Sequence, residues 1–347
     1  MTAKPVFSNI FFKPGILMSG YCYRNVGRNL LVFMGCTCLA SICFGQRRPE
    51  DELKIPDPEA VTVEASDGVP IRCSYYPGGF VEKPGDKDKK DKPKVEKKPG
   101  KEVVPIIMLH GWGGRRRDFD MLASQLQKAG HAILVPDLRG HGDSTTVTLA
   151  NGDVKEIDRE RLRSNEMAGF LLDVEAAKKF FMEKNNAKDS SGKNKEVEVN
   201  IELLCVIGSD VGAIAAVNWA AYDWSRTQLP AFKQGRDVKA LVLISPQESH
   251  KGFSLTKALS IPVIQKSLSL MLIVGEEDRT ASREAKSIHS RLERFREIPT
   301  DPRELDLVYI RQPAMLQGAE LINVPGLPLR DYIGTFIEHR LVRKAND

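Results

Sequence analysis

The stretch Gly208-Ser209-Asp210-Val211-Gly212 places one carboxylate between an apolar strand and a helix of small residues. A nucleophile on such a strand-to-helix turn needs small neighbours, because the backbone and the helix pack tightly around it. The two glycines supply that space, and a helix N-terminus favours the anionic form of an aspartate. The Asp210 carboxylate is therefore a candidate nucleophile. Aspartate also caps helices often, so the turn alone leaves both interpretations open.

The neighbouring hydroxyl of Ser209 is a second candidate nucleophile in the same turn. A serine turn centred on this residue would need glycines on both sides, and the sequence has Ile207 and Val211 there. We therefore expect the Ser209 side chain to point away from the site.

A carboxylate nucleophile needs a base that activates water, and histidine is the usual choice. His250 follows a predicted strand in SPQESHKG and could reach Asp210 at the end of a neighbouring strand. We assign it the role of a substitute base as a hypothesis; the alternative is an exposed loop histidine. The other histidines fall in motif loops, in helices or at the start of a strand: His110, His131, His141, His289 and His339.

The elements that must position these residues follow from the hydrophobic pattern. Near-continuous apolar runs alternate with amphipathic stretches, which indicates a parallel sheet covered by helices on both faces. Ligands bind such sheets at the carboxyl ends of the strands, where the candidate residues above are expected. Strands are expected at 103–110, 131–137, 201–207, 238–245, 268–274 and 306–310, and helices at 117–130, 167–184, from 210 onward, 282–296 and 328–342.

The net charge of +5 on 347 residues is unevenly distributed. Residues 1–45 carry +4 and residues 83–101 carry +5, so the rest of the chain is net −4. A nucleic-acid-binding surface should lie on the folded body, and here that body is mildly acidic. We therefore exclude nucleic acid as a partner.

The N-terminal 45 residues have the pattern of an export signal. An apolar run at 29–45 follows Arg24 and Arg28, and it is shorter than a membrane-spanning helix requires. We predict a signal peptide at 1–45, with an uncleaved membrane anchor as the alternative and Met18 as a possible true start. The expected location is the periplasm, the cell envelope or the outside of the cell, with membrane contact only through this segment.

Two further features bear on chemistry and partners. Cys73 and Cys205 lie in apolar strands beyond the N-terminal segment, and we expect inert core residues rather than a disulfide. No side-chain spacing is typical of a metal site, and we expect neither metal nor cofactor. Residues 82–102 are rich in Lys, Asp and Pro and almost free of apolar side chains, which predicts a disordered, solvated insert.

Four motifs resemble those of the α/β-hydrolase superfamily. LHGWGG at 109–114 is similar to its oxyanion loop, and PDLRGHGDS at 136–144 to the stretch that follows its fourth strand. GSDVG at 208–212 resembles its nucleophile elbow, and LIVGEEDRT at 273–280 the turn whose aspartate orients the catalytic histidine. Their order and spacing agree, and the resemblance covers about residues 60–342.

The resemblance implies an α/β fold with a mostly parallel eight-stranded sheet and helices on both faces. Only residues 246–267 separate the sixth and seventh strands, so the cap domain should be minimal or absent. Residues 46–347 would then form one α/β-hydrolase-like domain that contains the insert.

The resemblance also implies roles for individual residues. Asp210 stands where haloalkane dehalogenases and epoxide hydrolases have a carboxylate that attacks carbon and forms an ester. The backbone N–H groups of Trp112 and Val211 would form the oxyanion hole, and Asp278 would orient the catalytic histidine. The motifs that shape these loops contribute His110, Gly111, Gly208 and Gly212.

The chain departs from the superfamily pattern at the base. The loop after the last strand should carry the histidine, and residues 309–332 contain none. Breaking such a constellation costs on the order of 10⁴–10⁶ in rate. The absence of a cap also argues against a dehalogenase or an epoxide hydrolase, which use one to exclude water.

These observations predict an exported α/β-hydrolase-fold protein with a degenerate triad and weak or no catalysis. Its role would be binding or scaffolding, with a small-molecule ligand or a protein as partner. The alternative is an active hydrolase of ester- or alkyl-type substrates that uses Asp210 with a non-standard base such as His250. A third possibility is an interaction protein in which the Lys-rich insert is the functional part.

Overall fold

The computed structural model describes residues 53–85, 93–186, 197–229 and 233–345. An eight-stranded sheet forms its centre, and the strands from β6 to β14 along this sheet run parallel to one another. The first two pairs are antiparallel. In spatial order the strands are β1 (Glu59–Glu64), β2 (Pro70–Tyr76), β6 (Ala132–Pro136), β5 (Pro105–Leu109), β9 (Leu204–Ser209), β10 (Val238–Ile244), β13 (Ser269–Gly275) and β14 (Leu307–Gln312).

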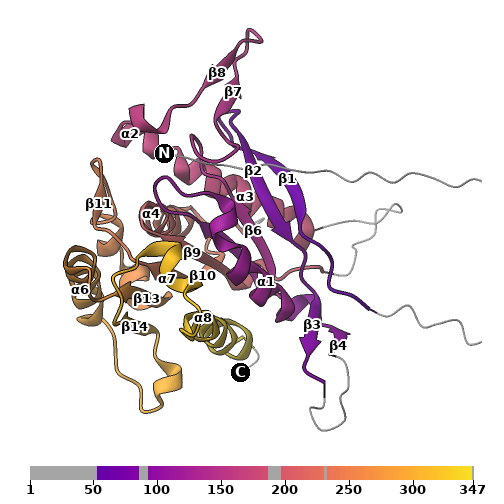
Figure 1. Cartoon of the computed structure of the whole chain (residues 1–347), viewed down its shortest axis with the longest axis vertical. Helices are drawn as coiled ribbons and strands as arrows, with labels where there is room; N and C mark the ends of the chain where they lie inside the picture. Colours follow the sequence, from indigo (N-terminus) through magenta and orange to yellow (C-terminus); the bar gives the residue numbers. More distant parts are fainter. Residues whose placement is uncertain (1–52, 86–92, 187–196, 230–232, 346–347) are drawn as a thin grey trace, which may run out of the picture. The chain divides into compact units, whose positions relative to one another are not determined.

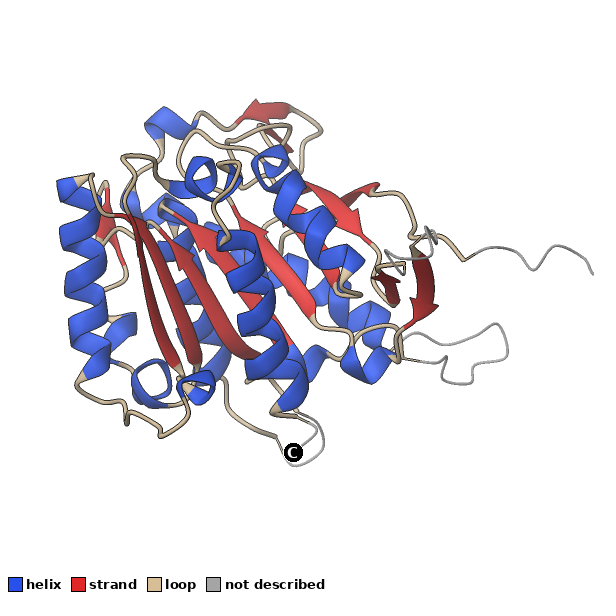
Figure 2. Ribbon diagram, turned by 60° about the horizontal axis from the view of Figure 1, so that its bottom comes forward, coloured by secondary structure: helices blue, strands red, loops and turns tan. Residues whose placement is uncertain are grey.

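Helices cover both faces of this sheet (Figure 2). On one face of the sheet, alternate strand residues form an apolar cluster with the helix residues Phe181, Trp219 and Ile288. On the other face, the intervening strand residues form a second cluster with Leu122 and Ile333. Burial on both faces explains why the central strands read as near-continuous apolar runs. The helices are α1 (Asp120–Lys128), α2 (Ser164–Met167), α3 (Phe170–Asn185), α4 (Val211–Ser225), α5 (Pro262–Lys266), α6 (Arg279–Glu293), α7 (Gly318–Asn323) and α8 (Leu329–Ile337), which continues into the π-helical turn η7 (Glu338–Arg343).

The predicted fold class is confirmed: this is the α/β-hydrolase arrangement, and no cap domain covers the sheet in the described part of the chain. The connection between β10 and β13 holds only a small hairpin and two short helices. That hairpin pairs β11 (Ser249–His250) with β12 (Phe253–Ser254). A second hairpin, β7 (Thr146–Thr148) with β8 (Val154–Glu156), projects beyond the sheet after β6 (Figure 1).

The Lys-rich segment differs from the expected solvated insert at its two ends. There β3 (Phe80–Lys83) and β4 (Lys94–Lys97) pair as an antiparallel hairpin. The backbone of Gly79 ties this hairpin to the domain by accepting from Lys98 N–H and donating to the Gly130 carbonyl. Backbone pairing and ion pairs such as Lys128–Glu82 order a segment that lacks an apolar face of its own.

Cys73 and Cys205 are free and buried, as predicted, and burial raises the pKa of both thiols. The predicted signal peptide at 1–45 lies outside the described residues. Within them, no helix combines the length and the apolar character that a membrane span requires.

Candidate active site

The turn between β9 and α4 has the tight geometry that its glycines predicted. Asp210 has φ 53° and ψ −117°, a conformation that residues with a Cβ rarely adopt. A Cβ on Gly208 would lie 2.4 Å from the Gly212 carbonyl oxygen, and one on Gly212 would lie 2.3 Å from the carbonyl oxygen of Leu109. Only glycine fits at either position, so these residues press the strained turn against the end of β5.

The Asp210 carboxylate contacts Trp112, one of the two residues whose N–H groups were predicted to form the oxyanion hole. The Trp112 N–H donates to Asp210 Oδ2 over 2.9 Å, while Oδ1 is buried and has no hydrogen-bond partner among the described residues. Gly111 permits this approach, since a Cβ there would lie 3.1 Å from Oδ2. The alternative role as a helix cap is wrong, because the Asp210 side chain makes no capping hydrogen bond to α4.

Electrostatics also differ from the expectation of a plainly anionic aspartate. Burial raises the pKa of Asp210 above its usual value. The N–H groups of Trp112 and Val211 and the nearby His250 ring favour the anion, but they do not offset the burial. The net result is a carboxyl group that keeps its proton to higher pH than a solvated aspartate does.

The first motif histidine has the structural role that the resemblance implied. His110 Nε2 accepts from the Leu138 N–H at 3.0 Å, and Nδ1 lies 2.8 Å from the Gly111 carbonyl oxygen. Burial lowers the pKa of His110, so the ring is neutral and joins the loops after β5 and β6. His141 is likewise buried, which lowers its pKa to about 4, and contacts the edge of the Trp112 ring.

A pocket of about 530 Å³ opens over Asp210 at the carboxyl ends of β5, β9, β10, β13 and β14. Its wall contains no lysine, arginine or histidine among the described residues. Three amide side chains are its other large polar groups. The carboxyl side chains are Asp118, Asp210, Asp278, Glu284 and Glu320, and the amides are Gln247, Gln317 and Asn323.

Asp278 does not orient a histidine. Its Oδ1 accepts from the N–H groups of Thr280 and Ala281 at 2.9 and 3.1 Å, which makes it the N-cap of α6. The structure therefore gives Asp278 a local structural role at the start of α6 in place of the histidine-orienting role that the resemblance implied.

Gln317 stands where the superfamily loop would present its histidine. It follows β14, precedes α7 and lines the pocket with Asp210. Its Nε2 donates to the Gly275 carbonyl at 3.1 Å, and its Oε1 is buried with no partner among the described residues. Next to it, Gly318 N–H donates to Ser245 Oγ at 2.8 Å and fixes the loop against β10. Only a histidine was expected in this loop from the sequence. The available signal for Gln317 was a polar residue directly before a helix that begins with glycine.

His250 approaches the site from the side of Trp112 and does not line the pocket. The two rings lie 4.6 Å apart between centroids, with 38° between their planes. Lys251 covers the same indole at 4.3 Å, a cation–π contact. His250 Nε2 is buried without a partner among the described residues, so this nitrogen makes no hydrogen bond to Asp210. The hairpin β11–β12 brings the His250 ring into contact with Trp112, so His250 is not simply an exposed loop histidine.

The expectation for Ser209 is wrong. Its side chain is buried and belongs to the pocket wall, with Oγ 3.0 Å from where a Cβ on Gly318 would lie. The loop before α7 packs over this hydroxyl and so makes Ser209 part of the pocket wall. The strained backbone conformation of the turn is at the next residue, Asp210.

The chain belongs to the alpha/beta hydrolase family, whose description matches residues 106–336. Among solved structures it is similar to a thermophilic carboxylesterase, EstE1, cloned from a metagenomic library: TM-score 0.54, 14% identity, covering 83% of this chain and 90% of that one. A dienelactone hydrolase from Anabaena variabilis gives a TM-score of 0.50 at 16% identity over 83% of this chain and all of that chain. An esterase from Pyrobaculum calidifontis gives 0.50 at 17% over 84% and 86%. These likenesses establish the fold. No curated protein matches the sequence.

Proposed function

We propose that this protein uses the α/β-hydrolase pocket to bind a small molecule and does not turn it over. The observation that carries the proposal is Gln317 at the position of the base. An amide cannot take a proton from water at neutral pH, so an ester formed on Asp210 would have no activated water to release it. Asp278 Oδ1 caps α6, and no histidine shares the described pocket wall with this carboxylate to complete a proton relay.

The charge of the pocket indicates the class of ligand. Its carboxyl groups face no lysine or arginine on the described wall, and Asp278 and Glu284 accept only backbone N–H groups, which leave their negative charge in place. A surface of one sign concentrates ligands of the opposite sign and repels those of its own. The expected ligands are neutral or cationic small molecules that contact Trp112.

A thermal-shift screen of the full chain against neutral, cationic and anionic small molecules tests this proposal. Stabilising compounds should be neutral or cationic, and Glu320→Lys at the pocket wall should weaken the cationic ones about tenfold. Glu277→Lys is the matched control, since Glu277 is exposed and lies outside the pocket wall. Hits dominated by anions, or hits equally sensitive to both reversals, would contradict it.

A second candidate function, hydrolysis with His250 as the base, rests on one observation. Asp210 Oδ1 and His250 Nε2 are both buried and unpartnered, and the ring acts electrostatically on the carboxylate. A panel of esters, epoxides and alkyl halides separates the two. Repeated turnover that is lost in both Asp210→Asn and His250→Gln would establish the hydrolase, and absence of turnover in the wild type would remove it.

The predicted export, the membrane contact and the role of the Lys-rich insert remain proposals beside this one. Deletion of residues 86–92 tests the last of these, since it spares the β3–β4 hairpin. If the deletion variant still binds a partner, or still stays with the cell envelope, as the wild type does, the insert is not the functional element.

A further inference from the structure

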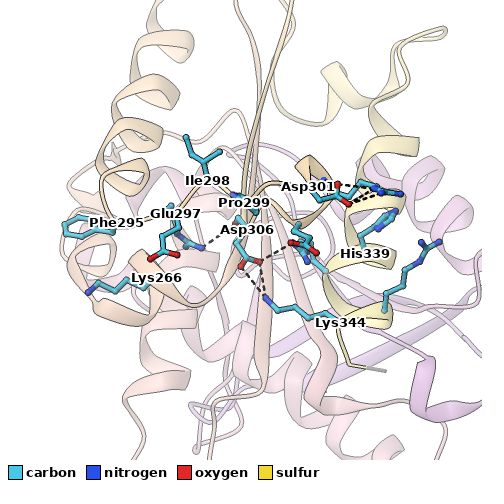
Figure 3. Close-up of a pocket in the computed structure, with 14 residues that line it drawn as sticks. Lys266, Phe295, Glu297, Ile298, Pro299, Asp301, Asp306, His339 and Lys344 are labelled. Carbon is cyan, nitrogen blue, oxygen red and sulfur yellow. Dashed lines mark hydrogen bonds and ion pairs between the residues drawn. The ribbon is translucent and has the colours of Figure 1, made fainter. Parts of the chain in front are cut away.

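A larger cavity, of about 840 Å³, lies at the amino ends of the strands, opposite the carboxyl ends that carry Asp210. It is formed where β13 and β14 begin, beneath the C-terminal end of α6 and the π-helical turn η7 (Figure 3). None of its lining residues belongs to the candidate active site. Any ligand it holds is therefore independent of the function proposed above.

Arg340 is the most deeply placed cation of this cavity. Only 9% of the residue is exposed, yet its Nε and Nη1 make no hydrogen bond within the described chain. Its one ion-pair partner among the described residues is Asp306, whose Oδ1 lies 3.7 Å from Nη1, beyond hydrogen-bonding distance. A buried guanidinium with unmade hydrogen bonds is costly unless something in the cavity accepts them.

Arg296 approaches the same point from the end of α6. Its Nη1 and Nη2 donate to the backbone carbonyls of Asp306 and Ile264 at 3.5 and 2.7 Å, and no carboxylate pairs with it among the described residues. Its Nε is buried without a partner. Two arginines from different elements thus meet beside Asp306 with unused donors.

Asp306 cannot neutralise these cations alone. Its carboxylate already accepts from Ser269 Oγ at 2.6 Å. It also accepts from Lys344 Nζ at 3.2 and 3.3 Å, as Figure 3 shows. Over the whole lining the positive groups exceed the negative ones by two charges. The positive groups are Lys266, Arg296, Arg303, Arg340, Arg343 and Lys344, and the negative ones are Glu297, Asp301, Glu304 and Asp306.

We propose that this cavity binds the phosphate group of a phosphate monoester between Arg296 and Arg340. Guanidinium forks match phosphate oxygens in pairs, and a phosphate dianion balances the two excess positive charges. The cavity exceeds the size of a phosphate, so an organic group fits with it. Phe295 and Ile298, 45% and 84% exposed at the rim, offer that group an apolar contact (Figure 3).

Isothermal titration of the full chain with inorganic phosphate and with phenyl phosphate, at ionic strength matched with KCl, tests the proposal. Saturable binding is expected, tighter for phenyl phosphate, and weakened at least tenfold by Arg340→Gln and by Arg296→Gln. Arg117→Gln is the matched control, since Arg117 is exposed at the other edge of the sheet, and it should bind as the wild type does. No saturable binding, or equal binding by all variants, would overturn the proposal.

A measurement on the wild type alone covers the case in which Arg340→Gln fails to fold. Phosphate should raise the wild-type Tm in a saturable manner, and KCl of equal ionic strength should not. Equal shifts from both salts would overturn the proposal.

Sedimentation with vesicles distinguishes a soluble phosphate monoester from a lipid headgroup. Phosphatidylcholine vesicles with and without phosphatidic acid are compared, for the wild type and for Arg296→Gln. Binding that needs both phosphatidic acid and Arg296 assigns the lipid source. Phosphate binding in solution without that dependence assigns the soluble one, and dependence on neither phosphate form contradicts the site.

Discussion

The candidate active site has two halves whose polar groups differ in what they contact. The elbow half lies at the ends of β5 and β9, and the base half lies at the ends of β13 and β14. At the ends of β5 and β9, the strained Asp210 turn, the small glycines and the Trp112 N–H retain the positions that a nucleophile and its oxyanion hole need. At the ends of β13 and β14, Asp278 caps a helix and Gln317 donates to a strand carbonyl. In the elbow half a backbone N–H contacts the candidate carboxylate, while in the base half the polar side chains bond to nearby backbone groups.

This difference has a physical reason. The elbow is fixed by backbone crowding, where any larger residue than glycine meets a carbonyl oxygen, so losing it would damage the fold. The base half depends on side chains that the fold does not require. A pocket can therefore lose proton transfer while its shape persists.

The largest expected effect lies in the elbow half. Gly212→Ala should lower the free energy of unfolding by about 3 kcal/mol, because its Cβ would overlap the Leu109 carbonyl. Urea denaturation measures this. Gly334→Ala on α8 is the control: its Cβ would meet Leu126 at an ordinary 3.7 Å, so a gain of up to about 1 kcal/mol is expected from helix propensity. Equal effects at both positions would refute the crowding argument.

The base half should accept a repair. Gln317→His places an imidazole in the pocket with Asp210, and hydrolysis of p-nitrophenyl acetate should rise about tenfold, equivalent to roughly 1.4 kcal/mol in the barrier. Stopped-flow absorbance under single-turnover conditions measures it. Gln247→His, in the same pocket wall, should give no such gain. A similar rise in both variants would show that any added imidazole suffices and that position 317 has no special role.

Asp278 should prove structural. Asp278→Ala removes two hydrogen bonds at the start of α6 and should cost about 1 kcal/mol of unfolding free energy. The same substitution at the exposed neighbour Glu277 should change little. Ligand binding in the pocket should persist in both variants; its loss in Asp278→Ala alone would assign this carboxylate a direct role.

The smallest effect concerns the protonation of Asp210. Since burial raises its pKa, the folded state binds this proton more tightly, and the resulting stability is full below the unfolded pKa and lost as pH rises through the folded value. Asp210→Asn should therefore raise Tm by a few degrees at pH 7 and by less at pH 4. A larger gain at pH 4 would show that the oxyanion-hole contacts outweigh the burial.

Much of the fold could be predicted from the sequence, because two-sided burial leaves a clear mark. The apolar runs at β9, β10 and β13 and the GSDVG turn located the central strands and the turn before α4 within a few residues. The β3–β4 hairpin carries no such mark, since backbone hydrogen bonds to distant segments such as Gly130 hold it to the domain. The π-helical end of the last helix carries none either.

The site could be predicted where sequence motifs determine the backbone conformation of a loop. It could not be predicted where the position of a side chain depends on its tertiary contacts. Trp112 and His110 took the expected places because loop geometry fixes them. Gln317 was missed because an amide has no characteristic pattern, and the contact of His250 with Trp112 depends on a two-residue hairpin whose direction the sequence does not state. Ser209 was misplaced because the packing of the loop before α7 against it is a tertiary contact.

Counting product molecules per chain tests the central claim most directly. The full-length wild type is incubated with 1-bromohexane, released bromide is titrated, and the intact mass of the protein is recorded. At most one bromide per chain is expected, with any release matched by a hexyl ester on Asp210 that persists. Many bromides per chain without an adduct, abolished by Asp210→Asn, would show that a base serves this pocket and that the protein is a working hydrolase.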